Sequence, residues 1–256
     1  MGNHKGNARM NRQLLFVSAA LFFAALASSG FAVVPNATIS WGAPTTISGD
    51  SDVSTDGTLV GAFNMNGPTA TVNGVTFASF MFTTNTPSAS DGNFTFTESS
   101  HVLAATGLGS GSPPFSNLSS SYQTLLSTAL TTDDNNTLTL NISGLTIGQQ
   151  YEFEFFLNGS NTAGTDNFRT IASAGNSVSL DDNTTNAVGG VGQFVIGTFT
   201  AASSNELITF NGTDSTQAPT INAFELRAVP EPATMSIFIF GSALLGISRA
   251  LRRKKQ

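Results

Sequence analysis

The stretch QYEFEFFL, residues 150–157, shows the clearest strand pattern in this sequence. Aromatic and aliphatic residues occupy every second position from Tyr151, and Glu152 and Glu154 fall between them. Successive side chains of a strand point to opposite faces. The alternation therefore predicts a strand with one face in a core and the other, with both glutamates, in water, as is typical of antiparallel sheets.

Similar short apolar segments recur along the body of the chain, separated by Gly, Asn, Asp and Pro at intervals of roughly 8 to 15 residues. They are TLVGAF, VNGVTFASFMF, NFTFT, TLTLNIS, NFRTIAS, SVSL, GQFVIGTFT, ELITF and INAFELR. This spacing predicts a mainly β fold, an antiparallel two-sheet β-sandwich of jelly-roll type, that forms one domain over residues 33–228.

One stretch of the body has a helical pattern instead. Apolar residues stand at positions 122, 125, 126, 129 and 130, directly after the serines 119–121. This spacing places them on one face of a helix. We therefore expect one short helix that plugs an end of the sandwich.

Charge is distributed unevenly along the chain. Every Lys and all but two Arg, Arg169 and Arg227, lie near the ends, so the body keeps 15 of the 16 acids and carries a net charge near −13. Such a surface repels phosphate backbones, which argues against nucleic-acid binding, and makes divalent cations more suitable partners. The absence of cysteine excludes disulfides, thiolate metal sites and a cysteine nucleophile.

The N-terminus has the pattern of a secretory signal. Three bases within residues 1–12 precede an apolar run over residues 14–27, and small residues follow. A positive region, a short apolar region and a small-residue site are what signal peptidase requires, which predicts a signal peptide at residues 1–27 with cleavage near 27 or 32. The alternative is an uncleaved anchor, for which the run is short.

The C-terminal stretch VPEPATMSIFIFGSALLGISRALRRKKQ, residues 229–256, combines two prolines, an apolar run and terminal bases. Residues 233–251 would form a helix about 28 Å long, just enough to cross a hydrocarbon core of roughly 30 Å. The positive-inside rule leaves the body outside and holds the bases in the cytoplasm. These bases are Arg249, Arg252, Arg253, Lys254 and Lys255.

In order and position, this tail resembles the PEP-CTERM sorting signal of Gram-negative bacteria, with Pro230, Glu231 and Pro232 as its motif. The resemblance implies that an exosortase, a transpeptidase-like membrane enzyme, recognises the tail and removes it near this motif. The protein would then be exported, held in the inner membrane as a precursor, and delivered to the envelope, surface or extracellular matrix. The alternative is an ordinary anchor that stays uncut.

No set of residues in the body predicts catalysis. Glu152 and Glu154 have the separation of a glycosidase pair, but on an exposed strand they lack a cleft that would separate their pKa values. His101 is the only histidine outside the signal, so a Ser-His-Asp triad is formally available, but no G-x-S-x-G turn accompanies it. We therefore expect no catalytic residues and no enzyme.

Acidic clusters could hold a structural Ca²⁺, although none has EF-hand spacing. One has Asp50, Asp52 and Asp56, and similar clusters stand at residues 133–136 and 181–183. Asp and Asn are also the usual turn residues, because their side chains bond the local backbone. Turn chemistry is the favoured interpretation, so no metal site or cofactor is predicted.

The body also resembles galactose-binding-like jelly rolls, including carbohydrate-binding modules, in LTLNISGLTIGQQYEFEFFLN (residues 138–158) and INAFELR. Such modules stack sugars on Trp or Tyr rings. Here Trp41 lies near the start of the fold and Tyr151 points inward by its strand pattern. The leading hypothesis is therefore a non-enzymatic exported sandwich, with a module that binds extracellular polysaccharide as the alternative and a glycoside hydrolase third.

Overall fold

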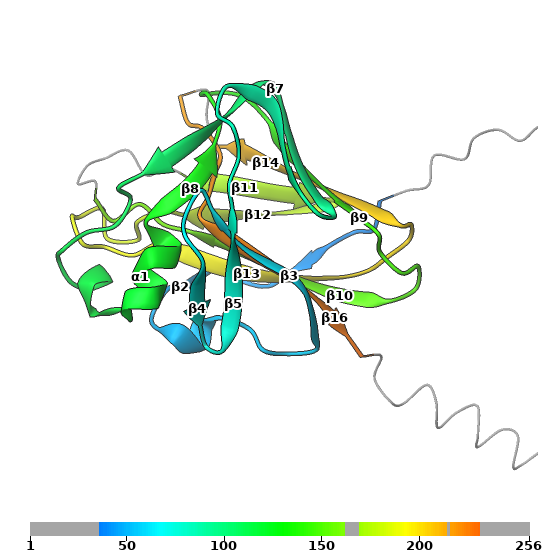
Figure 1. Ribbon diagram of the computed structural model, residues 1–256, viewed down its shortest axis with the longest axis horizontal. Coiled ribbons are helices and arrows are strands. Elements are labelled where there is room, and N and C mark those ends of the chain that lie inside the picture. Colours follow the sequence, from blue (N-terminus) through cyan, green and yellow to red (C-terminus); the bar gives the residue numbers. More distant parts are fainter. Residues whose placement is uncertain (1–35, 162–168, 214–215, 231–256) are drawn as a thin grey trace, which may run out of the picture. The chain divides into compact units, whose positions relative to one another are not determined.

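The computed structural model describes residues 36–161, 169–213 and 216–230. Two eight-stranded sheets and one α-helix, α1 (Ser120–Leu126), make up most of this part of the chain (Figure 1). The predicted mainly β, two-sheet sandwich with one short helix is confirmed. No helix within the described ranges has the length and apolar character needed to cross a membrane.

The first sheet has the order β1-β13-β10-β16-β3-β5-β4, and β2 also pairs with β13. Its strands are β1 (Ser40–Trp41), β2 (Thr45–Thr46), β3 (Thr58–Met65), β4 (Ala70–Val72), β5 (Val75–Phe80), β10 (Gln150–Leu157), β13 (Gln193–Thr200) and β16 (Ala223–Val229). Strand β10, which contains the alternating stretch at residues 150–157, therefore lies inside this sheet, between β13 and β16.

The second sheet has the order β12-β11-β14-β9-β7-β8-β15, and β6 also pairs with β7. Its strands are β6 (Thr86–Asp91), β7 (Phe94–Thr106), β8 (Thr128–Thr131), β9 (Leu138–Ser143), β11 (Arg169–Ala174), β12 (Asn176–Asp181), β14 (Asn205–Gly212) and β15 (Thr220–Ile221). All its pairings are antiparallel.

Each apolar segment singled out in the sequence contains a strand, but the antiparallel prediction has one exception. β3 and β5 run parallel, with Phe63 opposite Ala78. β4 and the turn at Asn73 and Gly74, both with positive φ, reverse the chain between them. The strands β1, β2, β4, β6, β8 and β15, which have two to six residues, were not anticipated from the sequence.

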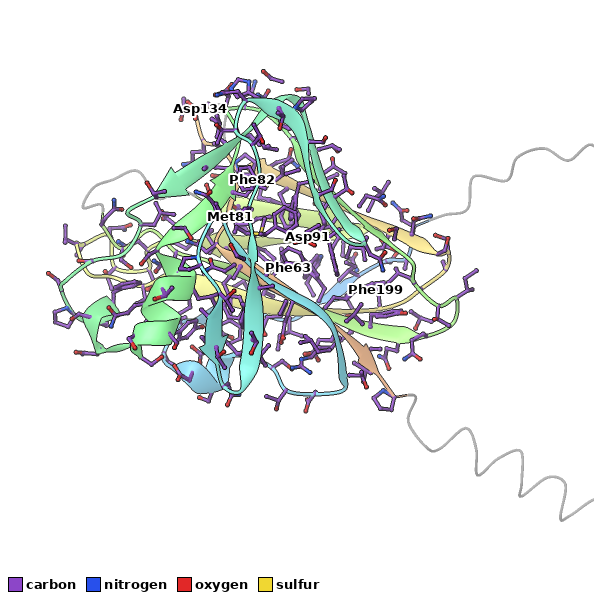
Figure 2. All side chains as sticks on the ribbon, viewed as in Figure 1. Phe63, Met81, Phe82, Asp91, Asp134 and Phe199 are labelled. Atoms are coloured by element: carbon purple, nitrogen blue, oxygen red, sulfur yellow. The ribbon has the colours of Figure 1, made fainter. Side chains whose placement is uncertain are left out.

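The main core lies between the two sheets and is built largely of phenylalanine. Figure 2 shows Phe63 among the side chains of this interior. Phe224 of β16 lies at its centre, with ring centroids 5.3 to 5.7 Å from those of Phe94, Phe96 and Phe153. The predicted inward face of β10 is confirmed, because Tyr151, Phe153, Phe155 and Leu157 all belong to this core.

A second core covers the other face of the first sheet. Phe156 and Phe194 point into it, next in sequence to Phe155 and Val195 of the main core. Helix α1 closes this core with Tyr122, Leu125 and Leu126. Part of β10 is therefore buried on both faces.

The helix is shorter than predicted and differently placed. It begins after Ser119, whose hydroxyl accepts a hydrogen bond from the Tyr122 N–H, and ends at Leu126. Residues 128–131 form β8 instead and pair with β7. The helix packs in the second core beside β4 rather than plugging an end of the sandwich (Figure 1).

Candidate functional site

Of the three residues of the predicted sorting motif, the structure describes Pro230, which is exposed and directly follows β16. Val229, assigned from the sequence to the tail, is the last residue of that strand. Glu231, Pro232 and the five terminal bases lie outside the described residues, as do the predicted signal peptide and transmembrane helix. The motif therefore begins where a sheet strand ends.

Strand β16 is held along both edges. Gln150 lies opposite Val229 on β10, and Thr58 lies opposite Ala228 on β3. The side-chain amide of Gln149 adds to this by donating to the Val229 carbonyl at 2.6 Å and to the Gln150 carbonyl at 2.9 Å. The main chain is thus fixed up to the peptide bond that precedes Pro230.

The prediction that Glu152 and Glu154 face water is wrong. Glu154 has no exposed surface and Glu152 only 9%, and the facing strand β16 adds Glu225, 1% exposed. In the register of the two strands, Glu154 lies opposite Glu225 and Glu152 opposite Arg227. The outer face of the first sheet therefore holds three buried carboxyl groups, which we call the acidic cluster, and one buried guanidinium.

Protons and Arg227 together compensate the charge of the acidic cluster. Burial raises the pKa of Glu154 well above its usual value, and raises that of Glu225. Interaction between the two carboxyl groups raises the pKa of Glu154 and lowers that of Glu225. One oxygen of each, Glu154 Oε1 and Glu225 Oε2, is buried without a hydrogen-bond partner. We therefore expect a protonated Glu154 that donates to an ionised Glu225, which also accepts from Arg227 Nε at 3.2 Å.

Residues 48–57 cover the acidic cluster. The Ser54 N–H donates to Glu154 Oε2 at 3.0 Å, and Arg227 Nη1 lies 3.5 Å from the Gly57 carbonyl. Gly57 has a φ of 72°, and a Cβ there would clash with the Ala228 carbonyl. The segment thus lies close against β16, which explains why the alternating pattern of β10 does not give an exposed face.

The first acidic cluster of the sequence, with Asp50 and Asp52, lies in this covering segment, and both carboxylates accept hydrogen bonds from nearby residues of the domain. Asp52 accepts from the Ser48 and Gly49 N–H groups at 2.6 and 3.0 Å, and Asp50 accepts from the Ser119 hydroxyl at 2.7 Å. Within residues 36–161, 169–213 and 216–230, no three His, Cys, Asp or Glu side chains are grouped so that they could hold a metal ion. The third cluster shows the same turn chemistry, since the Asn183 N–H donates to Asp181 Oδ1 at 3.0 Å.

His101 lies between a hydroxyl and a carboxylate. Its Nδ1 is 2.8 Å from Ser100 Oγ, and its Nε2 is 2.9 Å from Asp133 Oδ2. The structure therefore assembles the three residue types of a catalytic triad, with Asp133 coming from the second acidic cluster. If Asp133 accepts from Nε2, then Nδ1 is left to accept the Ser100 proton, as a general base would.

The backbone around Ser100 lacks the matching oxyanion site. The N–H groups of Ser100 and His101 both donate to the Glu98 carboxylate. Burial alone would raise the pKa of Glu98, but hydrogen bonds from Ser99, Ser100 and His101 outweigh it and lower that pKa. An ionised carboxylate thus occupies the donors that would have to stabilise an oxyanion, which disfavours acyl transfer here.

Glu206 of β14 is a further buried acid that the sequence analysis did not single out. It is fully buried and accepts from the Ala37 N–H at 2.8 Å. Burial raises its pKa to about 7, against the opposing effect of the Ala37 and Leu207 N–H groups. A signal was present in ELITF, where alternation places Glu206 on the same face as Ile208 and Phe210.

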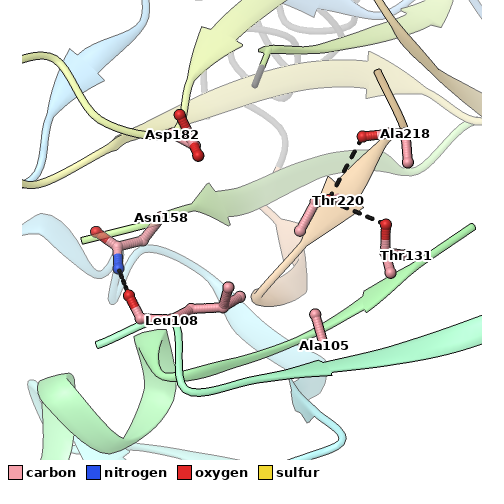
Figure 3. A pocket seen from close by; sticks show the side chains of 7 residues that line it. All are labelled: Ala105, Leu108, Thr131, Asn158, Asp182, Ala218 and Thr220. Atoms are coloured by element: carbon pink, nitrogen blue, oxygen red, sulfur yellow. Dashed lines mark hydrogen bonds between the residues drawn. The ribbon is translucent and has the colours of Figure 1, made fainter. Parts of the chain in front are cut away.

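Three cavities of the described part have polar and aliphatic walls. The one in Figure 3, about 170 Å³ in volume, is lined by Ala105, Leu108, Thr131, Asn158, Asp182, Ala218 and Thr220. A larger cavity of about 390 Å³ is lined by Thr46, Ile47, Ser48, Pro114, Asn117, Leu118, Thr184, Thr185 and Val191. A third, of about 330 Å³, is lined by Pro44, Ser179, Leu180, Asp181 and Gln193. None of these walls has an aromatic ring.

The aromatic residues that could stack on a sugar are packed elsewhere. Trp41 is half-buried and contacts the rings of Phe153 and Phe155 edge-on, with its indole N–H donating to the Asn176 carbonyl. Tyr151 is buried and stacks on Phe199. The large exposed hydrophobic residues of the described part are aliphatic or Met. These ranges therefore show no aromatic sugar platform.

Three solved structures show only distant similarity to this chain. Beta-glucuronidase 2 of Bacteroides uniformis is 15% identical with a TM-score of 0.42, over 66% of this chain and 18% of that one. An exo-beta-1,3-galactanase of Phanerochaete chrysosporium is 21% identical with a TM-score of 0.31, over 52% and 27%. The CBM35 of Abf62 from Cellvibrio japonicus is 14% identical with a TM-score of 0.26, over 38% and 69%.

The chain spans less than a third of the length of the first two of these proteins. With such low scores, none of the three likenesses bears on what this chain binds. A comparison with curated proteins finds no match.

The C-terminal end gives a specific match. Residues 228–254 match the model of the PEP-CTERM protein-sorting motif, in agreement with the resemblance seen in the sequence. The match starts at Ala228, inside β16, and includes Pro230 and the basic residues up to Lys254. The chain thus carries a PEP-CTERM protein-sorting motif, the mark of an exported protein of the cell envelope.

Proposed function

We propose that this chain is a non-enzymatic β-sandwich protein that is delivered to the cell surface or extracellular matrix after an exosortase has processed its tail. The observation that carries the proposal is the sorting motif at residues 228–254, whose first two residues are the end of β16, the last strand of the folded domain. Before processing, the apolar run anchors the precursor in the inner membrane, and signal peptidase removes the N-terminal segment.

Two features of the body support a non-enzymatic role. The acidic cluster is buried beneath residues 48–57, so a substrate has no access to its carboxyl groups without displacement of that segment. At Ser100 and His101 the two main-chain donors are bonded to Glu98. A hydrolase needs an accessible acid pair or an oxyanion site, and neither arrangement supplies one.

The first test is the fate of the tail in the native host. We expect the wild-type protein to leave the membrane fraction and to lack the mass of the C-terminal bases. A variant with Pro230, Glu231 and Pro232 all changed to alanine should stay in the membrane at full C-terminal length, because the motif is what the processing enzyme recognises. Fractionation and intact mass spectrometry measure both properties.

The matched control for this test is Pro44→Ala, which changes a proline of the same domain far from the motif in sequence. It should be processed like the wild type. Wild-type protein that keeps residue 256 in cells with an active exosortase would contradict the proposal.

Binding of a saccharide is a second candidate activity for the domain. It is supported by the cavity of about 390 Å³, whose size lies within the usual range for ligand sites. Thr46, Ser48, Asn117, Thr184 and Thr185 give its wall hydroxyl and amide groups that can bond sugar hydroxyls.

This candidate predicts retention of the processed protein on extracellular polysaccharide from its host. Asn117→Ala should weaken retention severalfold, because it removes one amide of the wall, at about 1 kcal/mol per hydrogen bond. Asn205→Ala, at the exposed start of β14 and not part of the wall of this cavity, is the control. Failure of the wild-type protein to bind any host polysaccharide in a pull-down assay would rule the candidate out.

A further inference from the structure

The folded domain and the sorting motif share residues. The matched motif starts at Ala228, and both Ala228 and Val229 are paired residues of β16. β16 is a central strand of its sheet, with β10 on one side and β3 on the other. The position at which the tail can be cut is therefore restricted by the fold of the domain.

The last bond held by the domain joins Val229 to Pro230. Its carbonyl oxygen accepts from the Gln149 side chain at 2.6 Å, and Val229 lies opposite Gln150 in the sheet. Pro230 has no N–H of its own, so it cannot donate to a further sheet hydrogen bond. Main-chain pairing with β10 thus ends at this peptide group.

An enzyme that cuts a chain must have access to an extended stretch of backbone on both sides of the bond. Within β16 those backbone groups are already bonded to β10 and β3. Release of a central strand has a free energy close to that of global unfolding. For a folded domain of ordinary stability, the population in which such a strand is open stays below roughly one in a thousand. Cleavage within the strand is slowed in proportion.

The ion pair of Glu225 and Arg227, just before Pro230, also contributes to the stability of the domain. Arg227 donates to the buried Glu225 from a position three residues before Pro230. A cut between Glu225 and Arg227 would leave Glu225 as a buried charge without this guanidinium, which is strongly unfavourable. Removal of part of β16 would therefore destabilise the domain that is being delivered.

We infer that the tail is cut on the C-terminal side of Pro230, so that the mature protein keeps all of β16 together with this proline. The inference rests on the proposed function, since it assigns the position of the same processing event. Hydrolysis there consumes one water, leaves a carboxylate on the domain and releases the tail with a free amine. The exposed Pro230 becomes the start of a short C-terminal extension.

The inference is tested by determining the last residue of the mature chain. The full-length gene product is expressed in its host, and the processed protein is analysed by intact mass and by sequencing of its C-terminal peptide. The expected last residue is Pro230 or a later one. A last residue at Val229 or earlier would overturn the inference while leaving exosortase processing intact.

A second measurement is independent of the host enzyme. The full-length chain in detergent is digested with proteinase K, and the end of the protected domain is mapped by mass. Protection that extends at least to Val229 supports the inference, and trimming into residues 223–228 overturns it. An uncut chain in the host would contradict the proposed function alone, because this digestion still tests the protection of β16.

The role of Gln149 is tested in the same digestion. Gln149→Ala removes one hydrogen bond from Val229, so trimming at Val229 should become roughly fivefold faster, the factor expected for one such bond. Gln123→Ala is the matched control, since its amide bonds the carbonyls of Ser116 and Leu118. Equal trimming of wild type and Gln149→Ala would show that Gln149 does not protect the bond.

Discussion

Arg227→Met should destabilise the processed protein by about 3–5 kcal/mol at pH 8, the range for removal of one partner of a buried ion pair. Arg227 donates to Glu225, which is 1% exposed, and lies opposite Glu152 in the sheet. Met is similar in length and apolar character to the aliphatic part of the Arg side chain. The loss of stability therefore reflects the missing charge more than missing volume. Chemical denaturation of the wild type and the variant measures it.

The loss should be smaller at pH 5. Protonation of Glu225 then replaces the guanidinium as the means of neutralising that carboxylate. The double variant Glu225→Gln/Arg227→Met provides the control, because it leaves no unpaired charge at position 225 and should recover part of the stability. A change within about 0.5 kcal/mol for Arg227→Met at pH 8 would show that the pair is not a significant source of stability.

Stability should fall as the pH rises from about 5 to 8, the reverse of ordinary acid denaturation. The pKa values of Glu154, Glu225 and Glu206 are all raised by burial, that of Glu206 to about 7. Above the usual value of 4.5, the folded state therefore holds protons that the unfolded state has lost. For each proton that only the folded state holds, the free energy of unfolding falls by about 1.4 kcal/mol for every unit by which the pH rises.

The sum of these effects should exceed about 2 kcal/mol between pH 5.5 and pH 8. Denaturant midpoints of the processed protein across this range measure the change. Equal stability at both pH values would contradict the assignment of a protonated Glu154.

Glu154→Gln identifies the main source of this pH dependence. The amide oxygen can still accept from the Ser54 N–H, and the amide nitrogen can donate to Glu225 without any need for a proton. We therefore expect a flatter pH profile and a gain in stability at pH 8. Glu98→Gln is the control, since the pKa of Glu98 is lowered and its contribution is lost only below pH 4.5.

The strands were predictable because their signal is local. In β10 the alternation of Tyr151, Phe153, Phe155 and Leu157 identifies the inward face without knowledge of any other strand. The end of α1 was not predictable in this way, because residues 128–131 have helical spacing but pair with β7 instead. A strand partner offered by tertiary structure outweighed the local pattern.

The acidic cluster was mispredicted for a similar reason. Phe156, on the same side of β10 as Glu154, was a sign that this side is also buried. The Glu225 and Arg227 pair was a second sign, because arginine is rare in the body of this chain. Neither sign identifies residues 48–57 as the segment that covers the cluster.

The sequence by itself determined the class of fold and the sorting signal of this protein. Both depend on patterns that are read along the chain: alternation in the strands, and two prolines, an apolar run and terminal bases in the tail. Only the tertiary structure decided that Glu154 is buried and that β16 runs into the sorting motif. Burial of Glu154 depends on the segment that contains Ser54, 100 positions away. The end of β16 within the motif depends on pairing with β10. Both facts rest on contacts between distant segments, so no local pattern contains either of them.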